Sequence, residues 1–532
     1  MLARVKSGAL LGVDAYLVEV EVDLAPGLPA FTTVGLPEAA VKESKDRVRA
    51  ALKNSGYQFP GNRITLNLAP ADVRKEGTGF DLPAALGILC AQGVVPQEAL
   101  ESYLVFGELS LDGRLKPTRG VLSMALVTRD AGLTLIIPRD NAREAGVVPG
   151  LSAFAAETLA QVVEFLGGRE ALPQAVAPEA GAPGEAVEDL DFREVRGQEQ
   201  VKRALLVAAA GGHNVLMVGP PGAGKTMLAR RLPGVLPPLT FEEALDVSRV
   251  YSIMGRLPPG QALLTARPFR APHHTISDAG LIGGGPTPRP GEVSLAHHGV
   301  LFLDELPEFK RPTLEVLRQP LEEGRVTISR AATSLTYPGR FMLVAAMNPC
   351  PCGYYGDLRR PCSCSPPQIS RYRARISGPL LDRIDIQVQV PAVKFQDLAG
   401  REDGEGSKEM RARVLKAREV QQRRFARSRS TFANAHMSAR LAKEHCMLGP
   451  EAQRLLEAAM ERLSLSGRAY HRILKIARTI ADLEGAADIA PVHVAEAIQY
   501  RTLDRKLTLE YSYGVKENVR FLSELIKPYS VN

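Results

Sequence analysis

The chain of 532 residues has no tryptophan, few cysteines, and no apolar run long enough to span a bilayer. Six cysteines in this length exclude a disulfide-built scaffold. The longest apolar segment, residues 204–218, is broken at 211–214 by two glycines, a histidine and an asparagine, and acidic residues soon follow the short apolar patch near residue 9. We therefore expect neither a membrane helix nor a signal peptide. The sequence predicts a cytoplasmic protein with no membrane partner.

The remaining composition is that of a globular protein with several domains. Hydrophobic residues make up 45% and charged residues 23% of the chain, and domains usually hold about 150 residues. The net charge of +7 is a mild excess that permits a polyanionic partner. Between residues 407 and 440 only Glu409 and Glu419 oppose a dense run of lysine and arginine. This run is either a nucleic-acid-binding helix or a solvated helix face.

The most specific motif is a phosphate-binding loop (P-loop) between a strand-like run at 214–218 and a helix-like run at 227–231. Glycines allow consecutive N–H groups to surround phosphate oxygens, and the helix N-terminus adds positive charge. The lysine should reach the β- and γ-phosphates of ATP, and the threonine hydroxyl should bind Mg²⁺. The nucleotide-binding residues are Gly219, Pro220, Pro221, Gly222, Ala223, Gly224, Lys225 and Thr226.

Two later strands end in residues that complete an ATPase site. The apolar run 300–303 precedes Asp304, expected to hold Mg²⁺, and Glu305, expected to orient and deprotonate the attacking water. The apolar run 341–347 precedes Asn348, which can position the same water (sensor one) or simply cap the turn before Pro349. The order of the strands favours the catalytic role for all three residues.

Arginines beyond these strands are candidates for the remaining catalytic charge. Arg383 precedes the last expected strand, where an arginine finger can reach the γ-phosphate held by a neighbouring subunit. A surface ion pair with Asp382 or Asp385 is the alternative. Arg468, before a helix at 473–483, is placed to sense nucleotide in its own subunit, and Arg472 is the second candidate.

The succession of motifs resembles the magnesium-chelatase-like branch of the AAA+ ATPases, and more closely its ComM (YifB-type) family. The resemblance covers residues 1 to about 505 and rests on Asp191-Phe192, Gly197-Gln198, GPPGAGKT, LFLDELPEF, AAMNPCPCGYYGD, SGPLLDRID and SGRAYHRILKIARTIADL. It implies a hexameric homo-oligomeric ring that uses ATP and Mg²⁺ to drive branch migration when transforming single-stranded DNA is recombined. The implied partners are single-stranded and branched DNA, with a recombinase as a further partner.

The N-terminal part resembles the proteolytic domain of Lon, which makes an ATP-dependent protease an alternative. The resemblance lies in residues 75–79, 107–115 and 136–138. Lon-type catalysis needs a serine activated by a lysine, but this chain has Gly79 and Leu122 at those places. Thr78 is a neighbouring hydroxyl without an evident amine. We therefore expect a structural or DNA-guiding domain.

Four cysteines lie within fifteen residues, and their grouping favours a metal site. Four thiolates suit tetrahedral Zn²⁺, although the C-x-C pairs are tighter than the usual C-x₂-C. Four reduced cysteines in a turn-rich loop are the alternative. The candidate zinc ligands are Cys350, Cys352, Cys362 and Cys364.

Several loops are candidates for DNA contacts. Arg270, Arg289 and the glycines at 283–285 could hold phosphates, while Tyr354 and Tyr355 could stack on bases. Histidines at 273–274 and 297–298 have no cysteine or carboxylate at ligand spacing, so we do not expect a second metal there.

The expected fold is α/β and multidomain: a Lon-protease-like domain, an AAA+ core with a parallel sheet, and a helical lid. The boundaries are 1–167, a linker at 168–188, the core at 189–392 with its cysteine knuckle at 350–364, the lid at 393–505 with a basic helix at 407–440, and a tail at 506–532. A motor that remodels a protein partner, as magnesium chelatases do, is the main functional alternative. A purely regulatory nucleotide-binding module conflicts with the complete catalytic set.

Overall fold

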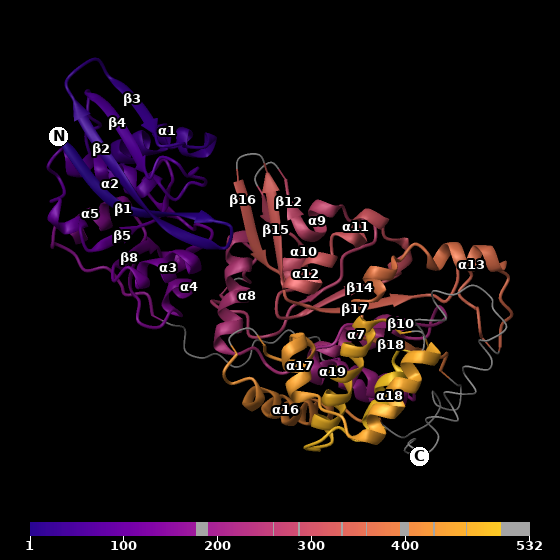
Figure 1. The fold of residues 1–532 in the computed structure, drawn as a ribbon. Coiled ribbons are helices and arrows are strands. Elements are labelled where there is room, and N and C mark those ends of the chain that lie inside the picture. Colours follow the sequence, from indigo (N-terminus) through magenta and orange to yellow (C-terminus); the bar gives the residue numbers. More distant parts are fainter. Residues whose placement is uncertain are drawn as a thin grey trace.

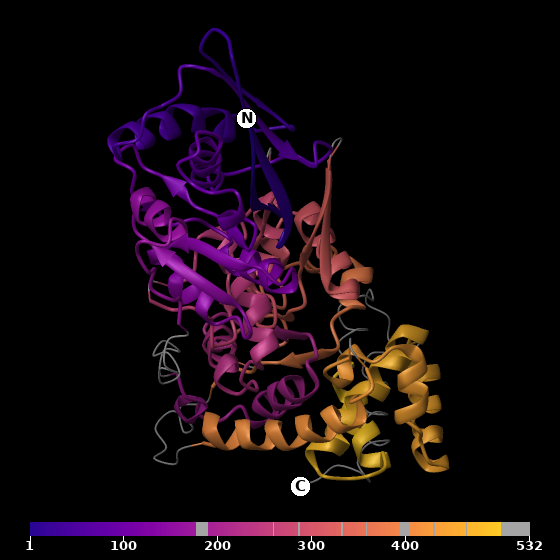
Figure 2. The same cartoon turned by 90° about the vertical axis from the view of Figure 1, so that its left-hand side faces the viewer.

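The computed structural model describes residues 1–176, 190–258, 260–285, 288–330, 333–357, 359–393, 404–428, 431–463 and 465–501. An N-terminal α/β domain, a central α/β domain and a C-terminal helical domain follow one another along the chain (Figures 1 and 2). Most of the expected linker and the whole expected tail lie outside the described residues. Leu172 and Ala175, at the start of that linker, are buried against the N-terminal domain, and Ala175 donates a backbone hydrogen bond to Ala153.

The N-terminal domain is a mixed sheet with the strand order β3-β4-β2-β1-β5-β8-β9. Strand β2 buries Val18, Val20 and Val22 on one face, the period of two expected for a half-buried strand. Helix α2 is buried all round and, after Asp81, which pairs with Arg47, apolar. The elements are β1 Leu2–Leu11, β2 Asp14–Ala25, β3 Ala30–Val34, α1 Ala39–Asn54, β4 Arg63–Ala69, α2 Asp81–Ala91, β5 Tyr103–Val105, β6 Glu108–Leu109, β7 Leu115–Lys116, α3 Val121–Asp130, β8 Thr134–Pro138, α4 Ala142–Gly146, β9 Ser152–Ala156 and α5 Leu159–Leu166.

The central domain is a parallel sheet with the order β11-β14-β17-β10-β18 and helices on both faces. In β14, Val300 and Phe302 pack into one core, while Leu301 and Leu303 pack into the core on the opposite face. A strand buried on both sides must be apolar throughout, which explains the continuous apolar runs in the sequence. The strands are β10 Val215–Val218, β11 Phe269–Arg270, β14 Val300–Leu303, β17 Met342–Met347 and β18 Ile386–Gln389.

The other elements of the central domain surround this sheet, and two hairpins, β12–β13 and β15–β16, project from it (Figure 1). The helices are α6 Glu199–Gly211, α7 Lys225–Arg231, α8 Phe241–Met254, α9 Asp278–Ile282, α10 Glu292–Leu295, α11 Arg311–Glu315, α12 Arg318–Glu323, α13 Pro366–Arg373 and α14 Gly378–Leu381. The hairpin strands are β12 Gly283–Gly284, β13 Arg289–Pro290, β15 Arg325–Arg330 and β16 Thr333–Pro338.

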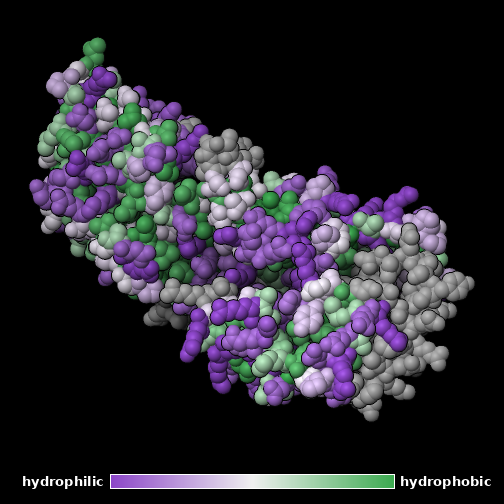
Figure 3. Space-filling model, viewed as in Figure 1, coloured by the Kyte–Doolittle hydropathy of each residue, from purple (hydrophilic) through white to green (hydrophobic). Residues whose placement is uncertain are grey.

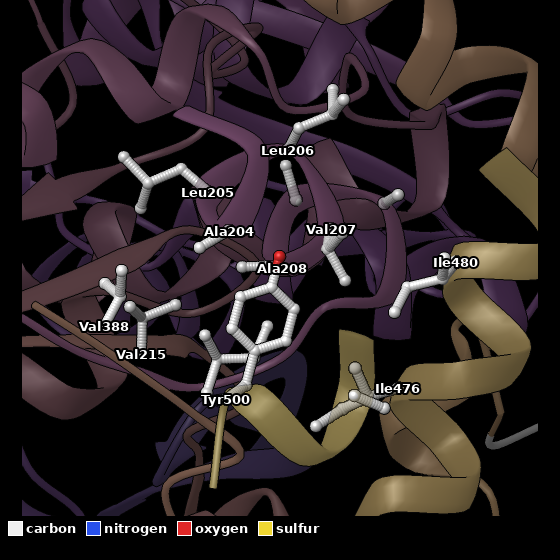
Figure 4. Close-up of a cluster of buried hydrophobic side chains, with 14 of the residues drawn as sticks. Ala204, Leu205, Leu206, Val207, Ala208, Val215, Val388, Ile476, Ile480 and Tyr500 are labelled. Atoms are coloured by element: carbon white, nitrogen blue, oxygen red, sulfur yellow. The ribbon is translucent and has the colours of Figure 1, made fainter. Parts of the chain in front are cut away.

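The helical domain shares its core with the central domain. Ile476, Ile480 and Tyr500 lie against α6 and the strands beneath it (Figure 4). Arg203 of α6 adds ion pairs to Glu484 and Glu496. The domain consists of α16 Ser407–Arg424, the short 3₁₀ helix η6 Asn434–His436, α17 Ala439–His445, α18 Pro450–Leu463, α19 Gly467–Leu483 and α20 Pro491–Gln499.

The expected basic helix at 407–440 is shorter than the sequence indicated. Helix α16 ends at Arg424, where Phe425 adopts a non-helical conformation. The following segment is rich in serine and threonine, whose side chains compete with helical hydrogen bonding. Two arginines of α16 are also paired with carboxylates. Arg413 pairs with Glu405, and Arg424 forms a two-pronged ion pair with buried Asp482. Fewer cations are therefore exposed than the sequence suggested.

The N-terminal domain contacts the central domain mainly through α3 and α8. Arg249 of α8 donates to the carbonyl of Val13, in the turn after β1, at 3.0 Å and pairs with Asp14 at the start of β2. Ser252 donates to Glu144 of the N-terminal domain, and Leu245 packs into that domain's core. Helix α8 thus connects the N-terminal sheet to the ATPase core.

Hydrophilic and hydrophobic residues are interspersed over the molecular face drawn in Figure 3. Among the helices of the described residues, none combines the length and the apolar character needed to cross a membrane.

Candidate functional site

A pocket of about 420 Å³ lies at the carboxyl edge of the central sheet. Its volume falls within the range of about 300–1,000 Å³ typical of small-molecule sites. Parallel strands end at the same edge, so residues that follow β10, β14 and β17 meet there. The lining residues are Pro221, Gly222, Ala223, Gly224, Lys225, Thr226, Met227, Asp304, Glu305, Met347 and Asn348.

Lys225 connects the P-loop with the end of β17. Its ammonium donates hydrogen bonds to the carbonyls of Gly219 and Pro220, at 2.8 and 3.0 Å, and to Oδ1 of Asn348 at 3.1 Å. Burial lowers the pKa of Lys225, and the charges of Asp304 and Glu305 oppose that shift. The lysine expected to reach the phosphates and the expected sensor-one asparagine are therefore direct neighbours.

The expected Mg²⁺ ligands also lie together. The Thr226 hydroxyl donates to Oδ2 of Asp304 at 2.6 Å. A threonine hydroxyl and a carboxylate are hard oxygen donors of the kind Mg²⁺ prefers, so these two side chains could hold the ion.

Glu305 has an unusual backbone and a partner that sequence reasoning missed. Its φ of 52° places a non-glycine residue in the left-handed region, which costs of order 1–3 kcal/mol and occurs most often at functional sites. Its carboxylate lies 3.5 Å from Nδ1 of His274. His274 follows β11, the strand beside β14, so the strand order of the sheet brings His274 and Glu305 together. The pair could have been predicted only from a prediction of that strand order.

Arg383 lies outside the nucleotide pocket of its own chain. It pairs with Glu322 of α12 and donates to the carbonyl of Pro379 at 2.6 Å, and its side chain is only 6% exposed. Its Nε is buried without a hydrogen-bond partner among the described residues. Neither Asp382 nor Asp385 forms the local ion pair considered as an alternative; Asp385 instead pairs with Arg472.

Arg468 is exposed at the start of α19 and does not line the nucleotide pocket of its own chain. Its charge acts instead on Arg383. Burial lowers the pKa of Arg383, the attraction of Glu322 opposes this, and repulsion from Arg318 and Arg468 adds to it. The second sensor candidate, Arg472, is committed to Asp385 and to the carbonyl of Arg383.

The four clustered cysteines converge on one point. The sulfur of Cys350 lies 3.4 Å from that of Cys352 and 3.7 Å from that of Cys362, and the latter two are 3.5 Å apart. Cys364 accepts a hydrogen bond from the Cys352 amide at 3.3 Å. Tetrahedral zinc with Zn–S bonds of about 2.3 Å places sulfurs roughly 3.8 Å apart. The donor set and its spacing therefore fit zinc.

The cysteine knuckle also touches the P-loop. Gly353 has a φ of 87°, and a β-carbon on it would lie 2.5 Å from Cδ of Pro221. Asn348 precedes the first cysteine by two residues. The knuckle therefore packs against one wall of the nucleotide pocket and continues directly from another.

The loops proposed for DNA contact differ in their availability. Arg270 is engaged by Glu292 through two hydrogen bonds of 2.6 and 2.8 Å, whereas Arg289 is exposed on the β12–β13 hairpin. The guanidinium of Arg360 lies over the ring of Tyr354 at 4.1 Å, and that of Arg373 over Tyr355 at 5.0 Å. These rings already have cationic partners.

The histidines do not form one cluster. His274 lies beside Glu305, with the ring of His273 against its own. His297 and His298 lie with Asp246 of α8, all three with ligand atoms within 4.8 Å. That carboxylate comes from an element distant in sequence, which spacing alone could not indicate.

The N-terminal domain carries no serine at the position expected of a Lon-type nucleophile. A β-carbon on Gly79 would lie 2.1 Å from the ring of Phe106. Leu122 is fully buried in α3. Thr78 donates to Glu108, and the nearby Lys75 ammonium donates to the carbonyl of Pro70. The described geometry offers no serine–lysine pair here.

Family comparisons define the class of protein. The model described as "Magnesium chelatase, subunit ChlI" matches residues 191–398, "Subunit ChlI of Mg-chelatase" matches 20–141, and "Magnesium chelatase, subunit ChlI C-terminal" matches 404–501. Together with the nucleotide pocket, these matches define a magnesium-chelatase-like AAA+ protein with the fold of an ATPase.

Full-length relatives narrow the family. The chain is 47% identical over 514 residues to the competence protein ComM of Haemophilus influenzae and 45% identical over 511 residues to the uncharacterized protein YifB of Escherichia coli; each alignment covers 95% of this chain and 98% of the relative. The magnesium-chelatase 38 kDa subunit of Rhodobacter capsulatus is 27% identical over 224 residues, 39% of this chain and 60% of that subunit. The chain belongs to the ComM (YifB-type) family, as its motifs indicated.

The contact between knuckle and P-loop yields a first prediction. Gly353→Ala should weaken ATP binding about tenfold, because the new methyl group collides with Pro221. Gly356→Ala is a matched control, since Gly356 also has a positive φ (81°) but nothing within 4 Å of the added carbon. Titration with a fluorescent ATP analogue measures both. Equal affinities in the two variants would mean that the knuckle does not shape the nucleotide pocket.

Proposed function

We propose that the protein is an ATP-driven, ring-forming DNA motor that promotes branch migration while transforming single-stranded DNA is integrated by recombination. The observation that carries this proposal is the convergence of Lys225, Asp304, Glu305 and Asn348 at one sheet edge, in a chain that aligns over nearly its full length with a competence protein. The first part supports ATP hydrolysis, and the second supports a role in DNA processing.

The residues of the pocket divide the work of hydrolysis. The P-loop amides and Lys225 bind the phosphates of ATP, and Asn348, already bonded to Lys225, orients the attacking water. Glu305 accepts a proton from that water. Thr226 and Asp304 would hold Mg²⁺, which supplies positive charge beside the phosphates. His274 lies 3.5 Å from the Glu305 carboxylate and is placed to influence when the base is available.

A neighbouring subunit completes the site. No arginine lines the pocket formed by the described residues, whereas the charge of Arg468 acts on Arg383 at another surface. In a head-to-tail ring this surface meets the next subunit's pocket. Arg383 must then exchange Glu322 for a γ-phosphate; Glu322 is 53% exposed, so the released carboxylate returns to water. We assign Arg468 to the same shared interface, and we propose six subunits.

The DNA role is supported by exposed cations as well as by the relative. Lys408, Lys416, Arg423 and Arg427 are exposed on α16 and just beyond it, and Arg289 is exposed on the β12–β13 hairpin. Such side chains bind phosphates without reading sequence. A motor acting on a protein partner is the competing function, supported by the more distant likeness to a magnesium-chelatase subunit. The geometry at Gly79 weighs against a protease.

The cysteine knuckle is proposed as a structural zinc site. All four ligands come from protein, which is typical of structural rather than catalytic zinc. Bound zinc would fix the segment that packs on Pro221 and follows Asn348.

Replacement of the catalytic base tests the motor. Glu305→Gln should lower ATP hydrolysis at least about 100-fold while ATP still binds. Glu308→Gln removes a nearby exposed carboxylate paired with Arg375 and should leave hydrolysis unchanged. The wild type should hydrolyse ATP faster with DNA and should unwind branched DNA. If it does neither, the DNA motor is refuted and a protein-remodelling motor is favoured.

A mixing experiment tests the shared site. Lys225→Ala and Arg383→Ala should each lose about 1,000-fold or more of the hydrolysis rate. In an equal mixture, about one interface in four joins an intact Lys225 to an intact Arg383, so activity should return on mixing. Arg325→Ala, which removes an exposed arginine, should be fully active alone. Failure of the mixture to recover activity would contradict a finger acting between subunits.

Metal analysis tests the knuckle. The purified chain should carry one zinc ion, and Cys362→Ser should reduce zinc content by at least tenfold. Cys446→Ala changes a cysteine outside the cluster and should keep the metal. Elemental analysis and thiol titration before and after chelation measure this. Metal-free protein with four freely reacting thiols would show that the cluster is not a zinc site.

A further inference from the structure

A second cavity lies between the central sheet and the helical domain, away from the nucleotide pocket. It is bordered by Gly299 and Met342, at the starts of β14 and β17, whereas the nucleotide pocket lies beyond the ends of those strands. The helical domain contributes Arg418, Phe432 and His436. The cavity holds about 70 Å³, enough for a few waters or one small ion.

Positive charge dominates its wall. Arg267, Arg340 and Arg418 line it, and Glu243 is the one carboxylate among the lining residues. Glu243 is already used: it pairs with Arg267 at 2.7 Å, lies 3.4 Å from His298, and accepts the backbone amide of Thr240. Two guanidinium groups therefore remain without a carboxylate partner in the cavity.

These two arginines still have donors to offer. Within the described residues, the guanidinium of Arg340 forms no ion pair and lies over the ring of Phe432 at 5.0 Å. Arg418 donates to the carbonyls of Phe432 and Ala209, but its Nε is buried with no partner among those residues. An unpaired guanidinium in a half-buried site costs free energy that an anion would recover.

A glycine keeps the space beside Arg418 open. Gly212 ends α6 with a φ of 70°, and a β-carbon there would lie 3.4 Å from the guanidinium of Arg418. The backbone conformation favours glycine, and the missing side chain leaves room against the cation.

A metal ion fits this region less well than an anion. The ligand atoms of Asp246, His297 and His298 are close enough for one ion. However, Nδ1 of His297 already accepts the amide of Arg340 at 3.1 Å, and the charges of Arg267 and Arg340 both act on His298. Repulsion from two guanidinium groups opposes a divalent cation and favours the opposite charge.

We propose that this cavity binds a small phosphate-type anion, held by Arg340 and Arg418 and covered by Phe432. Arginine presents several N–H donors in a plane that suits phosphate oxygens. The small volume and the covering ring suit a free phosphate group rather than a polymer backbone. Because Arg340 belongs to the central domain and Arg418 to α16, the anion connects the ATPase core to its helical lid. The site does not depend on the proposed DNA activity.

Calorimetry with orthophosphate tests the site. The full-length Lys225→Ala protein serves as the background, because the P-loop itself binds phosphate. One phosphate should bind per chain at constant ionic strength. Arg340→Gln should weaken binding at least tenfold, and Arg340→Lys should restore much of it. Arg325→Gln removes an exposed arginine paired with Glu323 and should bind like the background.

Further binding experiments identify whether the phosphate group belongs to a free phosphate, a nucleotide or DNA. ADP binding that exceeds phosphate binding and disappears with Arg340→Gln would assign the group to a nucleotide. Displacement of phosphate by a DNA oligonucleotide would overturn the proposal, since the cavity would then contact DNA. Hydrogen exchange gives a measurement without a cavity variant: phosphate should slow exchange in α16 and η6 and leave the N-terminal sheet unchanged. Unaltered exchange, or equal affinity in Arg340→Gln, would also overturn the proposal.

Discussion

The carboxylate of Asp385 is the interaction on which the arrangement of the ATPase depends. It accepts the backbone amide of Asn214 at 3.0 Å and pairs with Arg472 of α19. Burial alone would raise the pKa of Asp385, but the charge of Arg472 and the hydrogen bonds of His213 and Asn214 outweigh it and hold the pKa well below its usual value. Removing one partner from a buried pair costs about 3–5 kcal/mol, so this contact fixes the helical lid to the start of the P-loop strand.

The same contact positions the segment that carries Arg383, the proposed arginine finger. Asn214 begins the path into β10 and the P-loop, and its side chain donates to the carbonyl of Arg383 at 3.1 Å and accepts the amide of Leu343 at 2.9 Å. Asp385 and Asn214 therefore link α19 to the backbone of Arg383, the proposed arginine finger.

The nucleotide site could be predicted from the sequence because its residues follow parallel strands. Asp304 and Asn348 each come directly after an apolar strand, and the P-loop that carries Lys225 follows a third. A parallel sheet brings such residues to one edge whatever the loops between them do. Local spacing also located the cysteine cluster. The pairs Glu305–His274, Arg383–Glu322 and Arg270–Glu292 join elements far apart in sequence. The sequence pattern does not indicate how far apart such residues lie in space. Only the three-dimensional structure therefore identifies the partner of each charged residue. The end of α16 at Arg424 was missed because charge periodicity continues after the helix stops.

A single chain supplies the phosphate-binding residues of the site but no arginine from its own described residues. Two carbonyls and Asn348 of the same chain hold Lys225 at the wall of the pocket, so the charge proposed to bind the phosphates is already in place. In the proposed ring, the positive charge for the transition state comes from Arg383. Its ion-pair partner Glu322 is exposed, and its buried Nε has no hydrogen-bond partner among the described residues. An incompletely satisfied guanidinium binds a new anion with less loss than a fully bonded one. In the proposed mechanism, the catalytic charge is therefore complete only when a second subunit brings Arg383 to the pocket.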